Sequence, residues 1–287
     1  SGARSKSGGI SKESKHLFVQ DHKEWHDLHP RLIQTLTSKF QLTQPTTVQS
    51  RTIQTMQDAN KRNHNVLIHG ETGSGKTLAY LLPILQQLGF ASDAKPPSRK
   101  ELGTKCIILC PTRELASQTL TVVEKLCQFN FAGWMVPGGL LGGDSRDSEK
   151  ARVRKGLAII VATPGRLLDH LQKTESLLLN LKGKLQWLVL DEADRLLDMG
   201  LGDQVKQIVQ LIRANEASKS QPWWRSVLVS ATVTPSVQAL AKERMLCGDH
   251  EWVWVKGSIG KNDKQQSTTA NMENGDNNEN KKGSDDQ

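Results

Sequence analysis

Short runs of adjacent apolar residues alternate with longer amphipathic segments along most of the chain. The short runs are rich in Ile, Val and Leu, which is typical of strands buried on both faces of a sheet. The longer segments repeat apolar residues at helical spacing, as Val205, Ile208, Val209 and Ile212 do. This alternation predicts an α/β fold with a mostly parallel sheet and helices on both faces. The predicted strands are Val66–His69, Cys106–Cys110, Trp134–Val136, Ala158–Ala162, Trp187–Leu190, Ser226–Val229 and Trp252–Val255.

The two polar ends of the chain bound one predicted domain. Residues 1 to 22 are rich in Ser, Gly and Lys, so we expect a flexible N-terminal segment. Residues 258 to 287 contain almost no apolar side chain and should form a disordered polar tail, because they cannot offset the entropy of ordering. Residues 23 to 257 remain as a single domain, in which we expect Trp252 and Trp254 to lie in the core.

Composition and charge are those of a globular protein with an anionic partner. The 287 residues are 36% hydrophobic and 24% charged, with a formal net charge of +8. A basic surplus of this kind favours nucleic acid as a partner. The four cysteines form no CxxC pair, so we expect reduced thiols in an intracellular protein. No segment approaches the ~20 apolar residues of a membrane span, and no membrane association is expected.

The segment GETGSGKT follows a predicted strand and opens a helical pattern. Its spacing is that of a phosphate-binding loop, in the strand–loop–helix setting that the motif requires. The glycines let backbone N–H groups surround a phosphate at the positive end of the helix. We expect Lys76 to reach the β- and γ-phosphates of a nucleotide and the Thr77 hydroxyl to bind Mg²⁺. The predicted nucleotide-binding residues of this loop are Gly70, Glu71, Thr72, Gly73, Ser74, Gly75, Lys76 and Thr77.

Three carboxylates crowd the end of another predicted strand, in the segment LVLDEADRLLD. We expect Asp191 to complete the Mg²⁺ site through water, and Glu192 to orient and deprotonate the attacking water. Asp191, Glu192 and Lys76 are therefore the predicted catalytic residues of a metal-assisted phosphoanhydride hydrolysis. Taken alone, the acids also fit a helix N-terminus favoured by the helix dipole. The phosphate-binding loop in the same chain favours the catalytic interpretation.

Further blocks accompany these two motifs in a fixed order. With them the sequence resembles the DEAD-box RNA helicases of superfamily 2, and RLLDMG directly after DEAD is also typical of that family. The resemblance covers about residues 25 to 257 and implies a RecA-like P-loop domain with a Q motif near residues 25 to 53. The blocks are PTTVQ at 45–49, GETGSGKT at 70–77, PTRELA at 111–116, Gly-Gly at 142–143, TPGR at 163–166, DEAD at 191–194 and SAT at 230–232.

The resemblance implies roles for individual residues outside the phosphate loop. Gln49 would read the adenine edge by paired hydrogen bonds and so select ATP. Asp194, Ser230 and Thr232 would couple the nucleotide state to domain closure, with the two hydroxyls bonding towards the DEAD acids. RNA would be held mainly through phosphates and sugars, which carry little sequence information. The implied RNA-binding residues are Pro111, Thr112, Arg113, Gly143, Thr163, Gly165 and Arg166.

The adenine side of the Q motif departs from the family pattern. The family has Gly-Phe shortly before the Pro of this motif, whereas Gln41 and Leu42 stand there in this sequence. Leu42 would then replace an aromatic wall with an aliphatic one. Trp25 lies near the family's upstream aromatic position, with a spacing about one residue off. Leu42 and Trp25 join the predicted ATP-binding residues, and the departure bears on adenine affinity rather than on the chemistry.

Three functions follow from these patterns. The first is the ATP-binding half of an ATP-dependent RNA helicase that remodels RNA duplexes, with ATP and Mg²⁺ as cofactors. The second is a nucleotide-gated RNA-binding or scaffold module without turnover, and the third is a DNA translocase or another P-loop ATPase. The joint order of PTRELA, TPGR and DEAD argues against the third.

Three segments carry a finer resemblance, to the nucleolar DEAD-box group that assists assembly of the large ribosomal subunit. They are WHDLHPRLIQTL, DSEKARVRKG and RLLDHLQ. This likeness implies a nuclear or nucleolar location and pre-ribosomal particles as partners.

The part of the chain after Thr232 does not resemble the family's second RecA-like domain. That domain supplies an arginine for the γ-phosphate and the other half of the RNA groove. We therefore expect a piece of a longer protein, with a natively truncated protein as the alternative. We expect the isolated chain to bind nucleotide weakly and hydrolyse almost none. Outside the motifs, a basic cluster is expected to be a solvated helix face, with an RNA contact as the alternative. It consists of Lys150, Arg152, Arg154 and Lys155.

Overall fold

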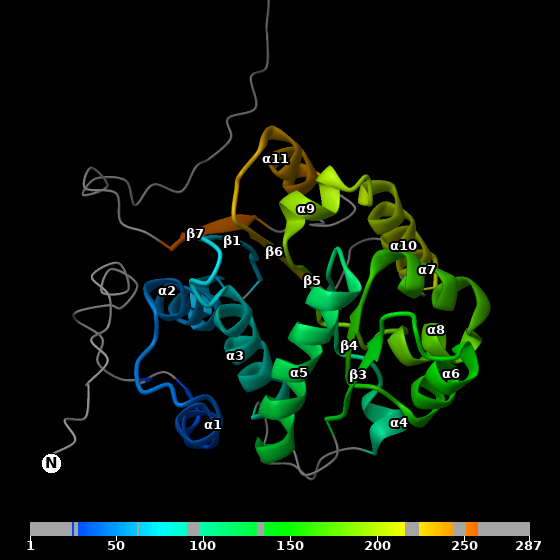
Figure 1. Cartoon of the computed structure of the whole chain (residues 1–287), viewed down its shortest axis with the longest axis horizontal. Coiled ribbons are helices and arrows are strands. Elements are labelled where there is room, and N and C mark those ends of the chain that lie inside the picture. Colours follow the sequence, from blue (N-terminus) through cyan, green and yellow to red (C-terminus); the bar gives the residue numbers. More distant parts are fainter. Residues whose placement is uncertain are drawn as a thin grey trace, which may run out of the picture.

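Seven strands form one sheet in which every neighbouring pair is parallel, in the order β3-β4-β2-β5-β6-β1-β7. The computed structural model in Figure 1 describes residues 25, 28–61, 63–90, 98–130, 135–215, 224–243 and 251–257. The predicted flexible segment and polar tail lie outside the described residues. The strands are β1 (Asn65–His69), β2 (Cys106–Leu109), β3 (Pro137–Leu140), β4 (Ile159–Ala162), β5 (Trp187–Leu190), β6 (Arg225–Ser230) and β7 (Trp252–Lys256).

Helices cover both faces of the sheet, as Figure 1 shows and the sequence predicted. Adjacent residues of a strand point to opposite faces. Thus Ile108 of β2 packs into the core under α1, α2, α3 and α5, and Ile107 packs into the core under α6 to α11. The helices are α1 (Pro30–Phe40), α2 (Thr47–Gln57), α3 (Lys76–Gly89), α4 (Arg99–Leu102), α5 (Arg113–Asn130), α6 (Arg146–Lys155), α7 (Pro164–Lys173), α8 (Glu175–Leu181), α9 (Ala193–Asp198), α10 (Gly202–Ala214) and α11 (Pro235–Lys242), with a 3-10 turn η2 (Ala59–Lys61).

The strand order decides which motifs meet. β6 pairs with both β1 and β5, so three segments that are distant in sequence end side by side. His69 at the end of β1 is in register with Ser230 at the end of β6, and Asp191 follows β5 directly. Ligands of parallel sheets bind beyond such carboxyl ends. The phosphate loop, the SAT block and the DEAD acids therefore share one edge of the sheet.

One predicted strand is wrong in position. The apolar pattern predicted Trp134–Val136, but β3 is Pro137–Leu140, and Trp134 lies outside the described residues. Proline and glycine are disfavoured in strands, so the apolar pattern did not predict a strand at positions 137 to 139. Close packing explains the glycines: a Cβ at Gly138 would lie 2.8 Å from the Leu157 side chain. Because β3 is an edge strand, the proline at its start costs little.

The expectation that Trp254 lies in the core is also wrong. Its side chain is 47% exposed, and Trp252 is only partly buried. The reason is that β7 is the other edge strand, which leaves one face less covered. Among the described residues, no helix is long and apolar enough to cross a membrane. The three described cysteines are buried and free, and burial raises the pKa of the Cys106 thiol.

Candidate nucleotide-binding site and RNA groove

The phosphate-binding loop runs from the end of β1 to the start of α3. Gly73 and Gly75 have φ angles of 82° and 88°, a region that suits glycine. Gly75 caps α3 without any side-chain hydrogen bond, so the first N–H groups of the helix can receive an anion. The ammonium of Lys76 donates to the carbonyl oxygens of Gly70, at 2.6 Å, and Glu71, at 2.8 Å. Burial lowers the pKa of Lys76, although nearby acids including Asp191 oppose this.

Asp191 is a buried carboxylate that faces α3. Its Oδ2 accepts a hydrogen bond from the Tyr80 hydroxyl at 2.8 Å, and its Oδ1 accepts one from the Glu192 N–H at 3.0 Å. Burial raises the pKa of Asp191 to about 6, while the Tyr80 hydrogen bond opposes that rise. In the described part of the chain Asp191 makes no ion pair. Since buried charges need a compensating partner, the site fits a cation.

Thr77 lies in the first turn of α3, directly after Lys76. It precedes Tyr80 by three residues, so the two share one face of the helix. The Tyr80 contact with Asp191 therefore directs the Thr77 face towards the acids as well. Sequence reasoning missed Tyr80, because only the tertiary fold brings its hydroxyl to Asp191.

Glu192 has a strained backbone. Its φ and ψ are 51° and 54°, in the left-handed region, where a residue with a side chain costs about 1–3 kcal/mol. The Arg195 guanidinium donates to the Glu192 carboxylate at 2.7 Å, and Glu192 is 26% exposed on its side chain. The predicted base is thus held at the start of α9 with its carboxylate partly open to solvent.

Asp194 joins the DEAD segment to the SAT block. Its Oδ2 accepts from the backbone N–H of Thr232 at 2.9 Å and from the Thr232 hydroxyl at 2.8 Å. The Ser230 hydroxyl donates to the Thr232 carbonyl oxygen at 2.6 Å. Burial raises the pKa of Asp194, but the bonds from Thr232 and Ser230 outweigh it and leave that pKa below its usual value. The structure brings these three predicted residues together.

Gln49 lies against the phosphate loop. It is 3% exposed, its Oε1 accepts from the Thr46 N–H at 2.9 Å, and its Nε2 donates to the Gly75 carbonyl oxygen at 3.2 Å. A primary amide retains one further N–H and one further lone pair. Trp25, 5% exposed, and half-buried Leu42 pack into the apolar cluster under α1.

Gly75→Ala should separate Gln49 from the loop. A Cβ there would lie 2.3 Å from Gln49 Nε2, and the φ of 88° adds backbone strain of about 1–2 kcal/mol. We expect about tenfold weaker ADP binding by calorimetry, from loss of about 1.4 kcal/mol. Gly183→Ala is the matched control, because Gly183 also has a positive φ but nothing within 4 Å of its Cβ position. Equal effects of the two variants on ADP binding would contradict the assignment.

The predicted RNA-binding residues follow β2, β3 and β4, which are neighbours in the sheet. Pro111 to Arg113 lead from β2 into α5, and Gly143 lies between β3 and α6. Thr163 to Arg166 lead from β4 into α7. The Arg113 guanidinium lies against Gly142, whose Cβ position is 3.1 Å from Arg113 Nη2. One edge of the sheet thus gathers all three blocks beside the nucleotide site.

A buried network of side chains around Glu149 lies beneath this edge, and sequence reasoning did not predict it. Glu149 of α6 is 1% exposed, and its Oε2 lies 2.7 Å from both Arg166 Nε and His170 Nε2. Its Oε1 accepts from the Gly142 N–H at 3.4 Å. Glu149 therefore connects the Gly-Gly loop, through the Gly142 N–H, to Arg166 of the TPGR block. Helical spacing alone gives no signal for a charged pair between two helices.

The fold and the site define a P-loop nucleotide-binding domain of the RecA-like class. The sequence profile of the DEAD/DEAH box helicase family matches residues 46–240, and this chain belongs to that family.

Individual known proteins agree with this assignment. The chain is 44% identical over 217 residues to "Probable ATP-dependent RNA helicase CG8611" of Drosophila melanogaster, covering 75% of this chain and 21% of that protein. It is 42% identical over 214 residues to "ATP-dependent DNA helicase DDX31" of Homo sapiens, covering 75% and 23%. A structure of Mss116p bound to ssRNA and AMP-PNP superposes with a TM-score of 0.66 at 29% identity, covering 81% of this chain and 43% of that one. This chain therefore spans under a quarter of the length of these two relatives.

Proposed function

We propose that this chain is the nucleotide-binding half of an ATP-dependent RNA helicase that couples ATP hydrolysis to the remodelling of RNA duplexes. One arrangement carries the proposal: Lys76, Asp191 and the Asp194–Thr232 contact lie at the ends of the adjacent strands β1, β5 and β6. A phosphate site, a buried acid and a switchable contact then share one edge of the sheet. The names of the relatives support the activity class.

In this proposal each residue has a chemical task. Lys76 leaves the carbonyls of Gly70 and Glu71 to bind the β- and γ-phosphates. Thr77 and Asp191 would hold Mg²⁺, which neutralises developing charge on the phosphate oxygens. Glu192 orients the attacking water and accepts its proton.

The contact between Asp194 and Thr232 would couple a change at the nucleotide site to a movement elsewhere in the protein. Their direct contact, at 2.8 Å, joins the segment that carries Glu192 to the strand β6. A shift of the DEAD segment on hydrolysis would therefore move the segment after Ser230. We propose that a second RecA-like domain responds to this shift and supplies an arginine to the γ-phosphate, and that the isolated chain hydrolyses almost no ATP.

RNA, rather than DNA, is the proposed nucleic acid. The names of the two relatives differ on this point, one being an RNA and the other a DNA helicase. The structure of Mss116p with ssRNA supports RNA, as do the blocks PTRELA and TPGR at the sheet edge. We further propose a role in assembly of the large ribosomal subunit, in the nucleus or nucleolus, from the likeness of RLLDHLQ and its companion segments to that group.

The test is RNA-stimulated ATP hydrolysis by a protein in which this chain is joined to a second RecA-like domain. We expect single-stranded RNA to raise the rate more than DNA of the same sequence, and Glu192→Gln to lower it by about 10²-fold or more. Stimulation by DNA alone would favour a DNA translocase. ATP-dependent RNA binding without hydrolysis, unchanged by Glu192→Gln, would favour the scaffold module.

A further inference from the structure

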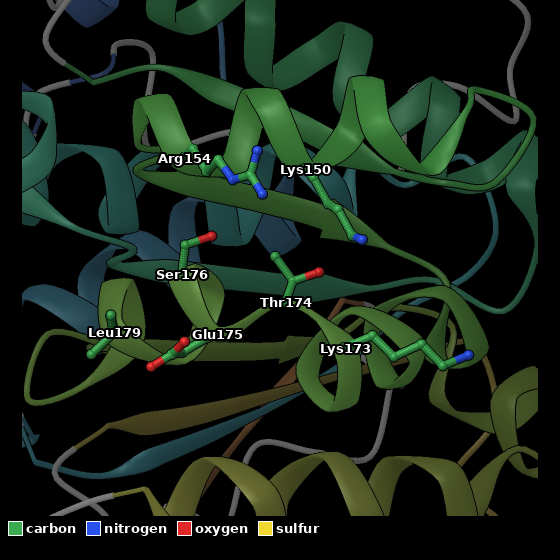
Figure 2. A pocket seen from close by; sticks show the side chains of 7 residues that line it. All are labelled: Lys150, Arg154, Lys173, Thr174, Glu175, Ser176 and Leu179. Atoms are coloured by element: carbon green, nitrogen blue, oxygen red, sulfur yellow. The ribbon is translucent and has the colours of Figure 1, made fainter.

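A cavity of about 400 Å³ lies apart from the nucleotide site, between α6, the end of α7 and the start of α8. Figure 2 shows its lining from close by. Two of its basic residues, Lys150 and Arg154, belong to the basic cluster of α6. For that cluster the sequence allowed two interpretations, a solvated helix face or an RNA contact. The lining residues are Lys150, Arg154, Lys173, Thr174, Glu175, Ser176 and Leu179.

The basic residues of α6 divide into two groups. Arg152 pairs with Asp144 at 2.7 Å, and Arg146 pairs with Asp169 at 2.9 Å. Lys150 and Arg154 make no ion pair within the described ranges. They stand four residues apart, so they share one face of α6 and repel each other.

An anion between Lys150 and Arg154 would remove this repulsion. Figure 2 shows both side chains directed towards the side of the cavity formed by Thr174 and Ser176, and the Glu175 carboxylate directed away from them. Lys173 also lines the cavity, but its ammonium bonds to Asp169 at 2.6 Å. Lys150 and Arg154 are therefore the cations left for a ligand.

Thr174 and Ser176 line the cavity opposite these cations. The Ser176 Oγ is buried and has no hydrogen-bond partner among the described residues. Thr174 is 5% exposed, and its Oγ1 lies 3.1 Å from His170 Nδ1. The Ser176 Oγ is shielded from solvent, so a ligand in the cavity would meet the two cations rather than this hydroxyl. Guanidinium and ammonium groups that lie side by side bind phosphate through charge-assisted hydrogen bonds.

The position of the cavity favours RNA as the source of that phosphate. α6 begins just after the Gly-Gly loop and α7 begins in TPGR, so both helices lead from the predicted RNA groove to the cavity. The ten residues of α7 span about 15 Å, or roughly four nucleotides of a strand. A strand that leaves the groove along α7 therefore reaches Lys150 and Arg154.

We propose that this cavity binds a backbone phosphate of RNA and extends the RNA path beyond the groove. The inference rests on the proposed RNA-binding function. In this inference Lys150 and Arg154 bind RNA independently of its sequence. The other two basic residues of the cluster do not bind RNA: Arg152 forms an ion pair with Asp144, and Lys155 faces solvent.

The test compares RNA of two lengths by fluorescence anisotropy with this chain. We expect Arg154→Ala to weaken binding of a single strand of about fourteen nucleotides by about threefold, and to lower the salt slope by about 0.7 for each lost phosphate contact. A strand of about six nucleotides, confined to the groove, should bind unchanged. Lys155→Ala is the matched control: it removes the same charge from the adjacent position of α6, and Lys155 does not line the cavity. Lys150→Ala should act as Arg154→Ala does.

A groove variant separates this inference from the proposed function. Arg113→Ala should weaken both lengths, because Arg113 lies at the predicted groove. An effect of Arg113→Ala without one of Arg154→Ala would overturn the cavity assignment and leave the proposed function intact. An effect of Arg154→Ala without one of Arg113→Ala would support the cavity as a phosphate site and contradict the groove assignment. A wild-type chain that binds neither strand would overturn both the cavity inference and the groove assignment. Binding of a poly-glutamate peptide that depends on Arg154, with RNA binding unchanged, would assign the cavity to an acidic protein segment instead.

Discussion

Lys76→Ala should abolish most ADP·Mg²⁺ binding by this chain, with a loss of about 2–5 kcal/mol, or thirtyfold or more in Kd. The reason is the position of the ammonium: it is half-buried at the loop, in reach of the Gly70 and Glu71 carbonyls, and surrounded by the DEAD acids. Without it, a bound phosphate would face those acids with only Mg²⁺ to offset the negative charge. Isothermal calorimetry measures the loss directly.

Lys125→Ala controls for the loss of one positive charge, because Lys125 is exposed on α5 and away from the loop. Thermal unfolding of both variants separates a binding defect from a folding defect. An ADP affinity of Lys76→Ala within about threefold of wild type, about 0.6 kcal/mol, would contradict the assignment of the loop.

Asp191→Asn should stabilise the ligand-free chain at pH 8 by up to about 3 kcal/mol, while removing the Mg²⁺-dependent part of nucleotide binding. Burial raises the pKa of Asp191 to about 6, from 3.8. The folded chain thus binds this proton more tightly than the unfolded chain does. Ionised Asp191 therefore destabilises the fold above about pH 6, and the penalty fades as the pH falls towards 4.

The asparagine fits the hydrogen bonds of the site. Its Oδ1 can accept from the Glu192 N–H, and its Nδ2 can donate to the Tyr80 hydroxyl oxygen. Urea unfolding at about pH 8 and about pH 4 measures the gain and its disappearance. Asp198→Asn, at an exposed position of α9, should change stability by no more than about 0.5 kcal/mol at either pH. A destabilised Asp191→Asn chain at pH 8 would contradict the burial argument.

Much of the nucleotide site could be predicted, because its motifs lie at the ends of clear strands. Apolar runs located β1, β5 and β6, and the carboxyl ends of parallel strands must share one edge. The meeting of Lys76, Asp191 and Thr232 then follows from the strand order, which the sequence pattern alone does not determine.

The remaining features depend on tertiary neighbours. In the sequence Tyr80 has the pattern of a core aromatic, and only the fold brings its hydroxyl to Asp191, which is 111 residues away along the chain. Glu149 and His170 lie at polar positions of separate helices, yet they form a buried contact of 2.7 Å beneath the predicted RNA groove. The exposure of Trp254 follows from the edge position of β7, which periodicity cannot reveal.

The most direct test of the central claim is calorimetric titration of ADP·Mg²⁺ into this chain, with GDP·Mg²⁺ as the comparison. The claim is that β1, β5, β6 and the Gln49 segment form an adenine-nucleotide site. It predicts that ADP binds and GDP does not, because the Gln49 amide lies against the Gly75 carbonyl at 3.2 Å with one N–H and one lone pair to spare. Equal binding of the two nucleotides would contradict adenine selection by Gln49. Binding of neither would contradict the claim that this chain alone holds a nucleotide.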